Sequence, residues 1–431
     1  MTELSFTDVH ALQILDSRGY PTLRVTLTSK DGTIATASAP SGASTGAHEA
    51  LELRDGGQAY SGRGVSKAVD GINAEIRQLL LSQSWSAQRG MDEALCDLDG
   101  TAEKSRLGAN AVVAVSMASA RAFAAHSRHP LHAWIAHTLG KAERLPVPHF
   151  NVLNGGAHAA NPLAFQEFMI APTGAPTLAE GIRWGTEIYH ALSATLRRKG
   201  LSTGLGDEGG YAPEISRPEE ALDLITAAIV DAGYTLGLEG VSIALDPAAN
   251  YFYHDGTYAF NGRSFTPTQM TGYYQKLITD YPIRSLEDPL AEDDPHGWPE
   301  LTAALGQRVQ VVGDDLFVTN PDRVREGIST VAANAVLIKP NQIGTVTETL
   351  DTLSVADRGG FSAMVSHRSG ETEDTFVADL AVGAGCGQLK SGAPARGERV
   401  AKYNRLLEIA DASPTMPYGL VLTESGRTRD A

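Results

Sequence analysis

Six short apolar runs, each ending abruptly in a charged residue, recur through the second half of the chain. They cover residues 242–246, 283–287, 311–314, 336–339, 364–367 and 387–390. Their charged ends lie 41, 27, 25, 28 and 23 residues apart. One strand plus one helix of a barrel takes roughly 25–30 residues, so the last four intervals each fit one such unit. The series predicts a parallel (β/α) barrel. A doubly wound open sheet is the alternative, because periodicity alone does not close a barrel.

The N-terminal third has a different pattern. Short alternating runs at 11–15 and 22–27 predict strands, and helical periodicity predicts helices at 66–81 and 109–125. Strands followed by helices favour an α+β unit.

Two segments rich in turn-forming or small residues divide this pattern. Pro40–Gly46 (PSGASTG) predicts a flexible loop that could fold over a substrate, with a plain connecting loop as the alternative. Residues 140–148 (GKAERLPVP) predict a domain boundary. We therefore expect an N-terminal domain over 1–138 and a barrel domain over 139–431.

Length and charge exclude several classes of protein. The chain has 431 residues, 42% of them hydrophobic, which is enough for two packed domains. Its 35 basic and 51 acidic residues give a net charge of −16, with no basic patch, so no nucleic-acid or membrane-surface partner is expected. Cys96 and Cys386 predict no disulfide framework. The N-terminus resembles no signal peptide and 109–125 is too polar to span a membrane, so we predict a cytoplasmic protein.

Asp246, Glu287 and Asp314 end three successive predicted strands. In a barrel they would converge, and like charges that close must share a cation, take up a proton or be separated by their neighbours. A set with only oxygen donors favours Mg²⁺ over Zn²⁺. The alternative for each residue alone is an acid that stabilises the N-terminus of the next helix.

Lys339 and Lys390 end two later strands on the same face. A lysine near bound cations, or near a second lysine, has its charged form disfavoured, so we expect that one is neutral and acts as a base. The alternative is that both form ordinary salt bridges.

Glu208 lies in a glycine-rich turn, Gly206–Gly210 (GDEGG), and Glu167 follows Gln166 in the preceding barrel unit. Neighbouring carboxyl groups raise one another's pKa, which keeps a general acid protonated. Residues 204–209 also match GxGxxG, but Asp207 and Glu208 would repel a pyrophosphate, so we reject a dinucleotide site.

His367, Arg368 and Ser369 lie at another strand end and predict a cradle for phosphate or carboxylate, with a solvated loop as the alternative. His158 lies in a glycine-rich loop, where a structural role is the commoner alternative. A metal site, a lysine base, an opposed carboxylic acid and an anion cradle together suit proton abstraction next to a carboxylate, followed by β-elimination.

Nine segments give the chain a resemblance to the enolase family that runs nearly end to end. They are DSRG (16–19), PSGASTG (40–46), LGANA (107–111), GDEGGYAP (206–213), SLEDP (285–289), GDDLFVTN (313–320), NQIG (341–344), SHRSGETED (366–374) and VAKYN (400–404). The resemblance implies an α/β fold: an α+β N-terminal domain and a C-terminal (β/α)8 barrel with an irregular ββαα start. The apolar runs do not reveal that start, and they leave the 41-residue interval unexplained.

The resemblance also implies a role for each matching residue. Asp246, Glu287 and Asp314 would bind one Mg²⁺, and Ser44 would reach a second Mg²⁺ once substrate is bound. Lys339 would remove the C2 proton, and Glu208, supported by Glu167, would assist loss of the C3 hydroxyl. The remaining implied pocket residues are Lys390 at the substrate carboxylate, Arg368 and Ser369 at its phosphate, and His158 and His367.

The activity implied by this resemblance is reversible, Mg²⁺-dependent dehydration of 2-phosphoglycerate to phosphoenolpyruvate, a lyase step of glycolysis, by a homodimer or octamer. Several residues depart from the usual pattern: Tyr20, Glu214, Pro247, Asn250, Tyr251, Pro340 and Ser391. They motivate an alternative, an enolase-like transferase of secondary metabolism similar to carboxyphosphonoenolpyruvate synthase in phosphonate biosynthesis. A non-catalytic surface enolase is a third reading. The C-terminal Arg429-Asp430-Ala431 argues against it, since such proteins tend to end in Lys.

Overall fold

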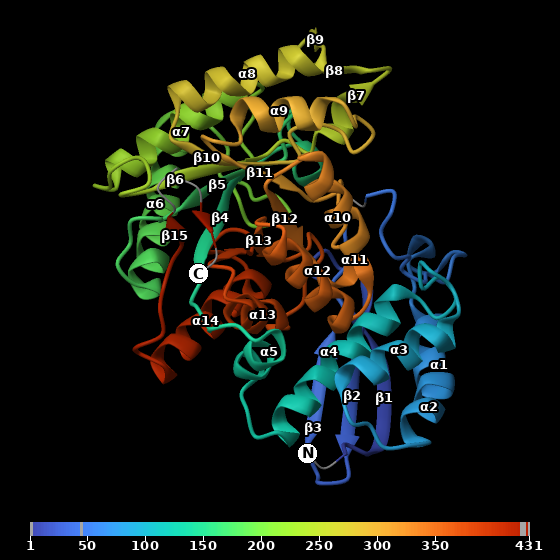
Figure 1. Cartoon of the computed structure of the whole chain (residues 1–431). Helices are drawn as coiled ribbons and strands as arrows, with labels where there is room; N and C mark the ends of the chain where they lie inside the picture. Colours follow the sequence, from blue (N-terminus) through green and yellow to red (C-terminus); the bar gives the residue numbers. More distant parts are fainter. Residues whose placement is uncertain (1–2, 44–45, 423–427, 430–431) are drawn as a thin grey trace.

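The N-terminal part of the chain forms an antiparallel three-stranded sheet with helices packed against it (Figure 1). The computed structural model describes residues 3–43, 46–422 and 428–429. The sheet has the order β1-β2-β3. Its strands are β1 (Phe6–Leu15), β2 (Pro21–Ser29) and β3 (Ile34–Ser38). The helices are α1 (Ser66–Gly71), α2 (Arg77–Leu81), α3 (Gln88–Asp99), α4 (Ala109–His126) and α5 (Leu131–Leu139).

The predicted helices of this unit are found with small differences. The helix expected at 109–125 is α4, whose buried residues pack on β2 and β3. The helix expected at 66–81 contains a π-helical turn, Ile72–Ile76, between α1 and α2. Asn73 in that turn exchanges two hydrogen bonds with the backbone of Ala11 on β1, of 2.8 and 3.0 Å. The wider turn thus fastens the helix to the sheet edge.

The second part is a closed barrel of eight strands with the order β10-β11-β12-β13-β14-β4-β5-β6, which confirms the predicted fold class. The barrel strands are β4 (Val147–Asn154), β5 (Glu167–Ala171), β6 (Ser242–Asp246), β10 (Ile283–Glu287), β11 (Gln310–Gly313), β12 (Ala335–Ile338), β13 (Ser362–Ser366) and β14 (Gln388–Lys390). The six predicted runs match β6 and β10 to β14 within two residues.

Helices follow the strands and surround the barrel in Figure 1. They are α6 (Leu178–Arg198), α7 (Pro218–Asp231), α8 (Pro267–Asp280), α9 (Gly297–Leu305), α10 (Pro321–Thr330), α11 (Pro340–Ile343), α12 (Val346–Arg358), α13 (Phe376–Ala384) and α14 (Gly397–Ala412). A short pair, β15 (Val421–Leu422) and β16 (Thr428–Arg429), follows α14.

Two barrel strands, β4 and β5, were not predicted from the sequence. β4 carries polar residues such as His149 and Asn151 that are nevertheless buried. β5 runs antiparallel to both of its neighbours, so its charged residue stands at its beginning. Glu167, the first residue of β5, pairs in register with Asp246, the last residue of β6. The reversed strand therefore brings a carboxylate to the same rim as the parallel strands.

The structure also accounts for the long interval between Asp246 and Glu287. After β6 the chain forms a small antiparallel sheet, β7 (Tyr253–His254), β8 (Thr257–Phe260) and β9 (Arg263–Phe265), before α8 begins. Aromatic side chains of this insertion pack against Phe165 of the barrel, with the ring centroids of Phe252 and Phe260 6.1 and 5.7 Å away. The interval therefore holds one strand–helix unit plus this insertion.

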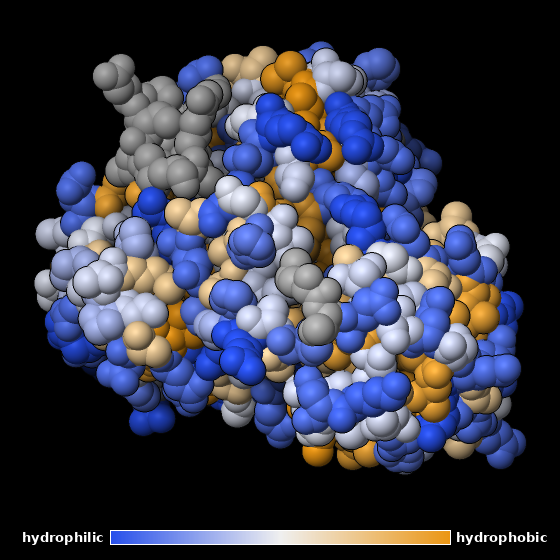
Figure 2. Space-filling view, turned by 60° about the horizontal axis from the view of Figure 1, so that its bottom comes forward, coloured by the Kyte–Doolittle hydropathy of each residue, from blue (hydrophilic) through white to orange (hydrophobic). Residues whose placement is uncertain are grey.

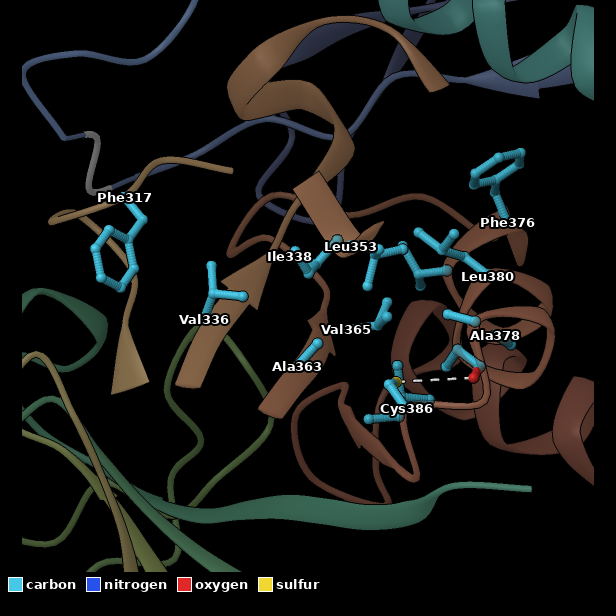
Figure 3. Close-up of a cluster of buried hydrophobic side chains, with 14 of the residues drawn as sticks. Phe317, Val336, Ile338, Leu353, Ala363, Val365, Phe376, Ala378, Leu380 and Cys386 are labelled. Carbon is cyan, nitrogen blue, oxygen red and sulfur yellow. Dashed lines mark hydrogen bonds between the residues drawn. The ribbon is translucent and has the colours of Figure 1, made fainter. Parts of the chain in front are cut away.

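Alternation along the strands decides which side chains enter the barrel. Ala335 and Leu337 of β12 form an apolar cluster with Val312 and Met364, separate from the main core. Val336 and Ile338 of the same strand point the other way, toward the helices, and belong to the main core (Figure 3). Continuing the alternation turns Lys339 inward. The same rule places Asp246, Glu287 and Lys390 at the inner rim.

The two parts of the chain pack closely on each other. Helix α5 lies against α13 of the barrel. The guanidinium of Arg121 on α4 makes two hydrogen bonds of 2.8 Å to the carboxylate of Asp374, in the segment after β13. The division at 138/139 stays a prediction, because α5 ends at Leu139 in contact with both parts.

Polar side chains are also buried deeper in the barrel. His149 on β4 donates from Nδ1 to the carbonyl of Val147 (3.1 Å), and its Nε2 lies 3.5 Å from a nitrogen of Arg284. Burial, together with the charge of Arg284, lowers the pKa of His149 to about 3. The folded protein therefore holds this imidazole neutral well below the pH at which a free histidine gains a proton.

This depressed pKa predicts an acid sensitivity. Below about pH 6.5 the unfolded chain binds a proton at His149 that the folded chain refuses, so stability falls as the pH drops toward the folded value. Between about pH 5.5 and 4, we expect urea unfolding of the wild type to lose about 1.4 kcal/mol more per pH unit than that of His149→Gln. His190→Gln, at an exposed position on α6, is the control. Equal slopes for wild type and His149→Gln would contradict the prediction.

None of the helices in the described residues is long and apolar enough to cross a bilayer. The face shown in Figure 2 is mostly hydrophilic, with hydrophobic side chains in small separate groups.

Candidate functional site

The inner rim of the barrel gathers the carboxylates and lysines that end its strands. The ammonium of Lys390 lies 2.7 and 2.8 Å from the two carboxylate oxygens of Glu287. The same Nζ lies 3.2 Å from Glu167 and 3.4 Å from Asp246. All four side chains are buried. One lysine from β14 thus bridges carboxylates from β5, β6 and β10.

The electrostatics of this cluster follow from burial and proximity. Burial alone would lower the pKa of Lys390, but Glu167 and Glu287 raise it well above its ordinary value. Burial, with Asp246 beside it, raises the pKa of Glu287 well above its usual range. The carboxylates around Lys390 therefore favour its ammonium form.

Lys339 has a similar pairing on the other side. It forms an ion pair with Asp314, whose second oxygen accepts a hydrogen bond from the amide of Gln342 (2.9 Å). Burial alone would lower the pKa of Lys339, but Asp314 raises it. Asp314 therefore favours the ammonium form of Lys339, and the neutral amine expected beside bound cations stays a prediction. Pro340 is the first residue of α11 and leaves Lys339 extended, at φ −131° and ψ 102°, as expected for a residue before proline.

The three predicted metal ligands are neighbours, since both Asp246 and Asp314 raise the pKa of Glu287, but they are not a group whose ligand atoms all lie within 4.8 Å of one another. Asp246 and Glu287 converge on Lys390, whereas Asp314 pairs with Lys339. Among the described residues, two other groups have ligand atoms within 4.8 Å of one another: His158 with Glu167 and Glu208, and Asp288 with Asp314 and Asp315. The ammonium groups explain the difference, because each draws the nearest carboxylates toward itself.

The donor set nevertheless fits a hard divalent cation. Asp246, Glu287 and Asp314 are 3, 2 and 7% exposed and offer only carboxylate oxygens, which Mg²⁺ prefers. Buried carboxylates need a compensating cation, and here two lysines supply that charge. Asp246 is also held in place, since one of its oxygens accepts the backbone N–H of Ala248 (2.9 Å). Ser44, predicted for the second ion, lies outside the described residues.

A second cluster contains the carboxylates predicted for acid chemistry. His367 Nε2 lies 3.2 Å from Glu208, and His158 Nδ1 lies 3.6 Å from Glu208 and 3.7 Å from Glu167. The amide of Asn151 donates to Glu208 (3.0 Å). Both predicted carboxylates, and both histidines, are thus brought together.

Their protonation differs from the prediction. Burial, with Glu208 nearby, raises the pKa of Glu167 well above its usual range. Burial also acts to raise the pKa of Glu208, but the neighbouring His367 and His158 hold this pKa well below its usual range. Glu167 is therefore the member that binds a proton more readily, and Glu208 the one that ionises more readily. We expected each carboxylate to raise the pKa of the other, but only Glu167 has a raised pKa.

The predicted anion cradle is already engaged by a carboxylate. Glu49 accepts hydrogen bonds of 2.8 and 3.1 Å from the guanidinium of Arg368, and both side chains are buried. Ser369 Oγ accepts from the backbone N–H of Ala43 (2.6 Å). Gln342 also contacts Glu49 (3.3 Å), so it links the Arg368 pair to Asp314. Sequence reasoning missed both Glu49 and Gln342, although Gln342 lies in the NQIG segment.

The unusual residues lie around the site in different ways. Asn250 donates to Asp315 (2.9 Å) and accepts from the backbone of Glu292 (2.9 Å), beside the acidic end of β11. Tyr20 stacks under Arg63, whose guanidinium carbon lies 4.1 Å from the ring centroid. Tyr251 and Glu214 are exposed, whereas Ser391 is buried. Pro247 precedes Ala248, which has a positive φ of 48°.

Comparison with known families agrees with this geometry. Residues 6–135 match the family described as "Enolase, N-terminal domain", and residues 142–416 match "Enolase, C-terminal TIM barrel domain". Together the two matches cover most of the chain. The chain belongs to the enolase family, whose members generally bind Mg²⁺.

Proposed function

We propose that this enolase-family enzyme catalyses the reversible dehydration of 2-phosphoglycerate to phosphoenolpyruvate. One observation carries the proposal. A single barrel rim holds a buried lysine, Lys339, the carboxylate pair Glu167 and Glu208, and the buried guanidinium of Arg368. Proton abstraction, departure of a hydroxyl group and recognition of a phosphate need these three kinds of group.

Each residue has a role that its surroundings support. Lys339 takes the C2 proton, which requires that its ammonium first lose a proton and its pairing with Asp314 be relieved. Glu208 assists loss of the C3 hydroxyl, with the protonated Glu167 beside it as the store of the proton. His158 and His367 face this pair and complete the pocket.

The substrate's anionic groups are held by the remaining cations. Arg368 binds the phosphate, in exchange for Glu49, and Ser369 adds a hydroxyl contact. Lys390 binds the carboxylate. Asp246, Glu287 and Asp314 would hold one magnesium ion and Ser44 would reach a second, which together would supply stabilisation of negative charge on the substrate carboxylate.

The test is direct. Purified protein is incubated with 2-phosphoglycerate and Mg²⁺, and formation of phosphoenolpyruvate is followed. We expect turnover that EDTA abolishes and that added Mg²⁺ restores. A folded protein that binds Mg²⁺ but forms no product would overturn the proposal.

A second candidate is a related reaction on a small phosphonate, as in phosphonate biosynthesis. The observation that favours it is Asn250, which departs from the family pattern and bridges Asp315 and Glu292 beside the carboxylate rim. Incubation with 2-phosphoglycerate, with and without a small phosphonate, followed by phosphorus NMR, separates the two. A new phosphorus signal from a product that contains a carbon–phosphorus bond, seen only when both compounds are present, favours this candidate.

We also propose a cytoplasmic homodimer, with an octamer as the alternative, as the family resemblance implies. Light scattering of the purified protein gives the assembly mass, which for a dimer is twice the 45.6 kDa of the chain.

A further inference from the structure

Arg399 on α14 has no role in the proposed reaction, yet it is fully buried at the back of the site. Its Nη1 donates to the backbone oxygen of Arg368 (2.6 Å), and its Nη2 donates to those of Ser369 (2.5 Å) and Asp207 (3.3 Å). One guanidinium therefore fastens the loop after β13 to the turn that carries Glu208.

The same guanidinium also contacts an imidazole. Arg399 Nη1 is hydrogen-bonded to Nδ1 of His367. A guanidinium has donors and no acceptor, so Nδ1 of His367 must be the acceptor and carries no proton. The single proton of the neutral ring then lies on Nε2, which is 3.2 Å from the carboxylate of Glu208.

The other states of His367 are disfavoured by the same contacts. A ring protonated on Nδ1 would point an N–H at the N–H groups of Arg399. A ring turned by 180° would place carbon atoms against both Arg399 and Glu208 and lose both interactions. The imidazolium form is disfavoured as well, because burial lowers the pKa of His367 to about 4.

We propose that Arg399 is a positioning residue that fixes His367 as the Nε2-protonated tautomer, so that the N–H of this histidine faces Glu208. Two N–H groups then face the carboxylate of Glu208: that of His367 Nε2, at 3.2 Å, and that of the Asn151 amide, which donates a hydrogen bond to it (3.0 Å). The tautomer follows from the contacts of the free protein; its value for catalysis rests on the proposed function, in which Glu208 assists departure of the hydroxyl group.

The test is nitrogen NMR of protein labelled at histidine, recorded at neutral pH without substrate. His367→Gln identifies the His367 signals by their disappearance. We expect Nδ1 to show the shift of an unprotonated nitrogen and Nε2 that of a protonated one. A His367 protonated on Nδ1, or on both nitrogens, would overturn the proposal, and this measurement needs no variant of Arg399.

Variants then test whether Arg399 is the cause. Arg399→Gln should leave His367 as a mixture of tautomers, seen as averaged nitrogen shifts. Arg396→Gln is the matched control, because Arg396 also donates to a backbone oxygen of the same turn, Gly206 (3.0 Å), but makes no hydrogen bond with His367 among the described residues. Unchanged His367 shifts in Arg399→Gln would contradict the assignment. If that variant does not fold, Arg399→Lys replaces it.

Kinetics separate this inference from the proposed function. If 2-phosphoglycerate is the substrate, we expect kcat of Arg399→Gln to fall by about 10- to 100-fold, as is typical when a group that orients a functional residue is lost. KM should stay within about threefold, because Arg399 contacts Arg368 and Ser369 only through their backbone oxygens and not through the side chains proposed to bind phosphate. A protein without turnover counts against the proposed function and leaves the tautomer to be decided by NMR.

Discussion

Lys339→Met is expected to lower turnover of 2-phosphoglycerate by about 10²- to 10⁴-fold, the range typical for loss of a general base. Methionine keeps much of the volume of the buried lysine but cannot accept a proton. The decisive measurement is exchange of the C2 hydrogen of 2-phosphoglycerate in D₂O, followed by NMR, because exchange reports proton abstraction even when no product forms. Lys339→Met should lose this exchange.

Two variants make the result specific. Glu208→Gln should keep C2 exchange while product formation falls, because it removes the group that assists the hydroxyl and leaves the base. Lys141→Met, which breaks a surface ion pair with Asp357 (3.0 Å), should change neither. C2 exchange at the wild-type rate in Lys339→Met would assign the base to another residue.

The second large effect concerns stability. Lys390→Met removes the one ammonium that lies against Glu167, Asp246 and Glu287. Breaking a buried ion pair by removing one partner costs about 3–5 kcal/mol, so we expect a loss of at least that size in urea unfolding with EDTA present. Protonation of Glu167 and Glu287 relieves the repulsion, so the loss should be smaller at about pH 6 than at about pH 8.

Magnesium should partly replace the missing charge. We expect Mg²⁺ to raise the Tm of Lys390→Met more than that of the wild type, since a cation that binds only the folded state stabilises it. Lys104→Met is the control: Lys104 is equally buried but has a single carboxylate partner, Glu348 (2.9 Å), outside this cluster. Its smaller loss should not respond to Mg²⁺. An equal rise in Tm with Mg²⁺ in both variants would show that this cluster is not where the metal ion binds.

The sequence predicted most of the barrel because charge marks where its parallel strands end. In β6, β10 and β14 the last residue is charged and points inward, so one signal gave both the strand and a site residue. β4 and β5 escaped this reasoning, since polar residues are buried along β4 and Glu167 stands at the start of β5.

The protonation states could not be predicted in the same way. Residue types alone said that Glu167 and Glu208 raise each other's pKa. The structure adds two histidines beside Glu208, which reverses the direction for that residue. Likewise Lys339 lies beside Asp314, and Arg368 beside Glu49, a partner from the other end of the chain. Such pairings depend on tertiary contacts between segments far apart in sequence.

The reversed direction of β5 has a consequence for engineering. Because β4 and β5 are joined as an antiparallel hairpin, the connecting loop carries His158 and leads directly into Glu167. Both groups thus form one contiguous cassette, residues 154–167, whereas Asp246, Glu287 and Asp314 come from other strands. Exchanging residues 154–167 between homologues would replace the surroundings of His158 and Glu167 together, while leaving every carboxylate of the proposed magnesium set untouched.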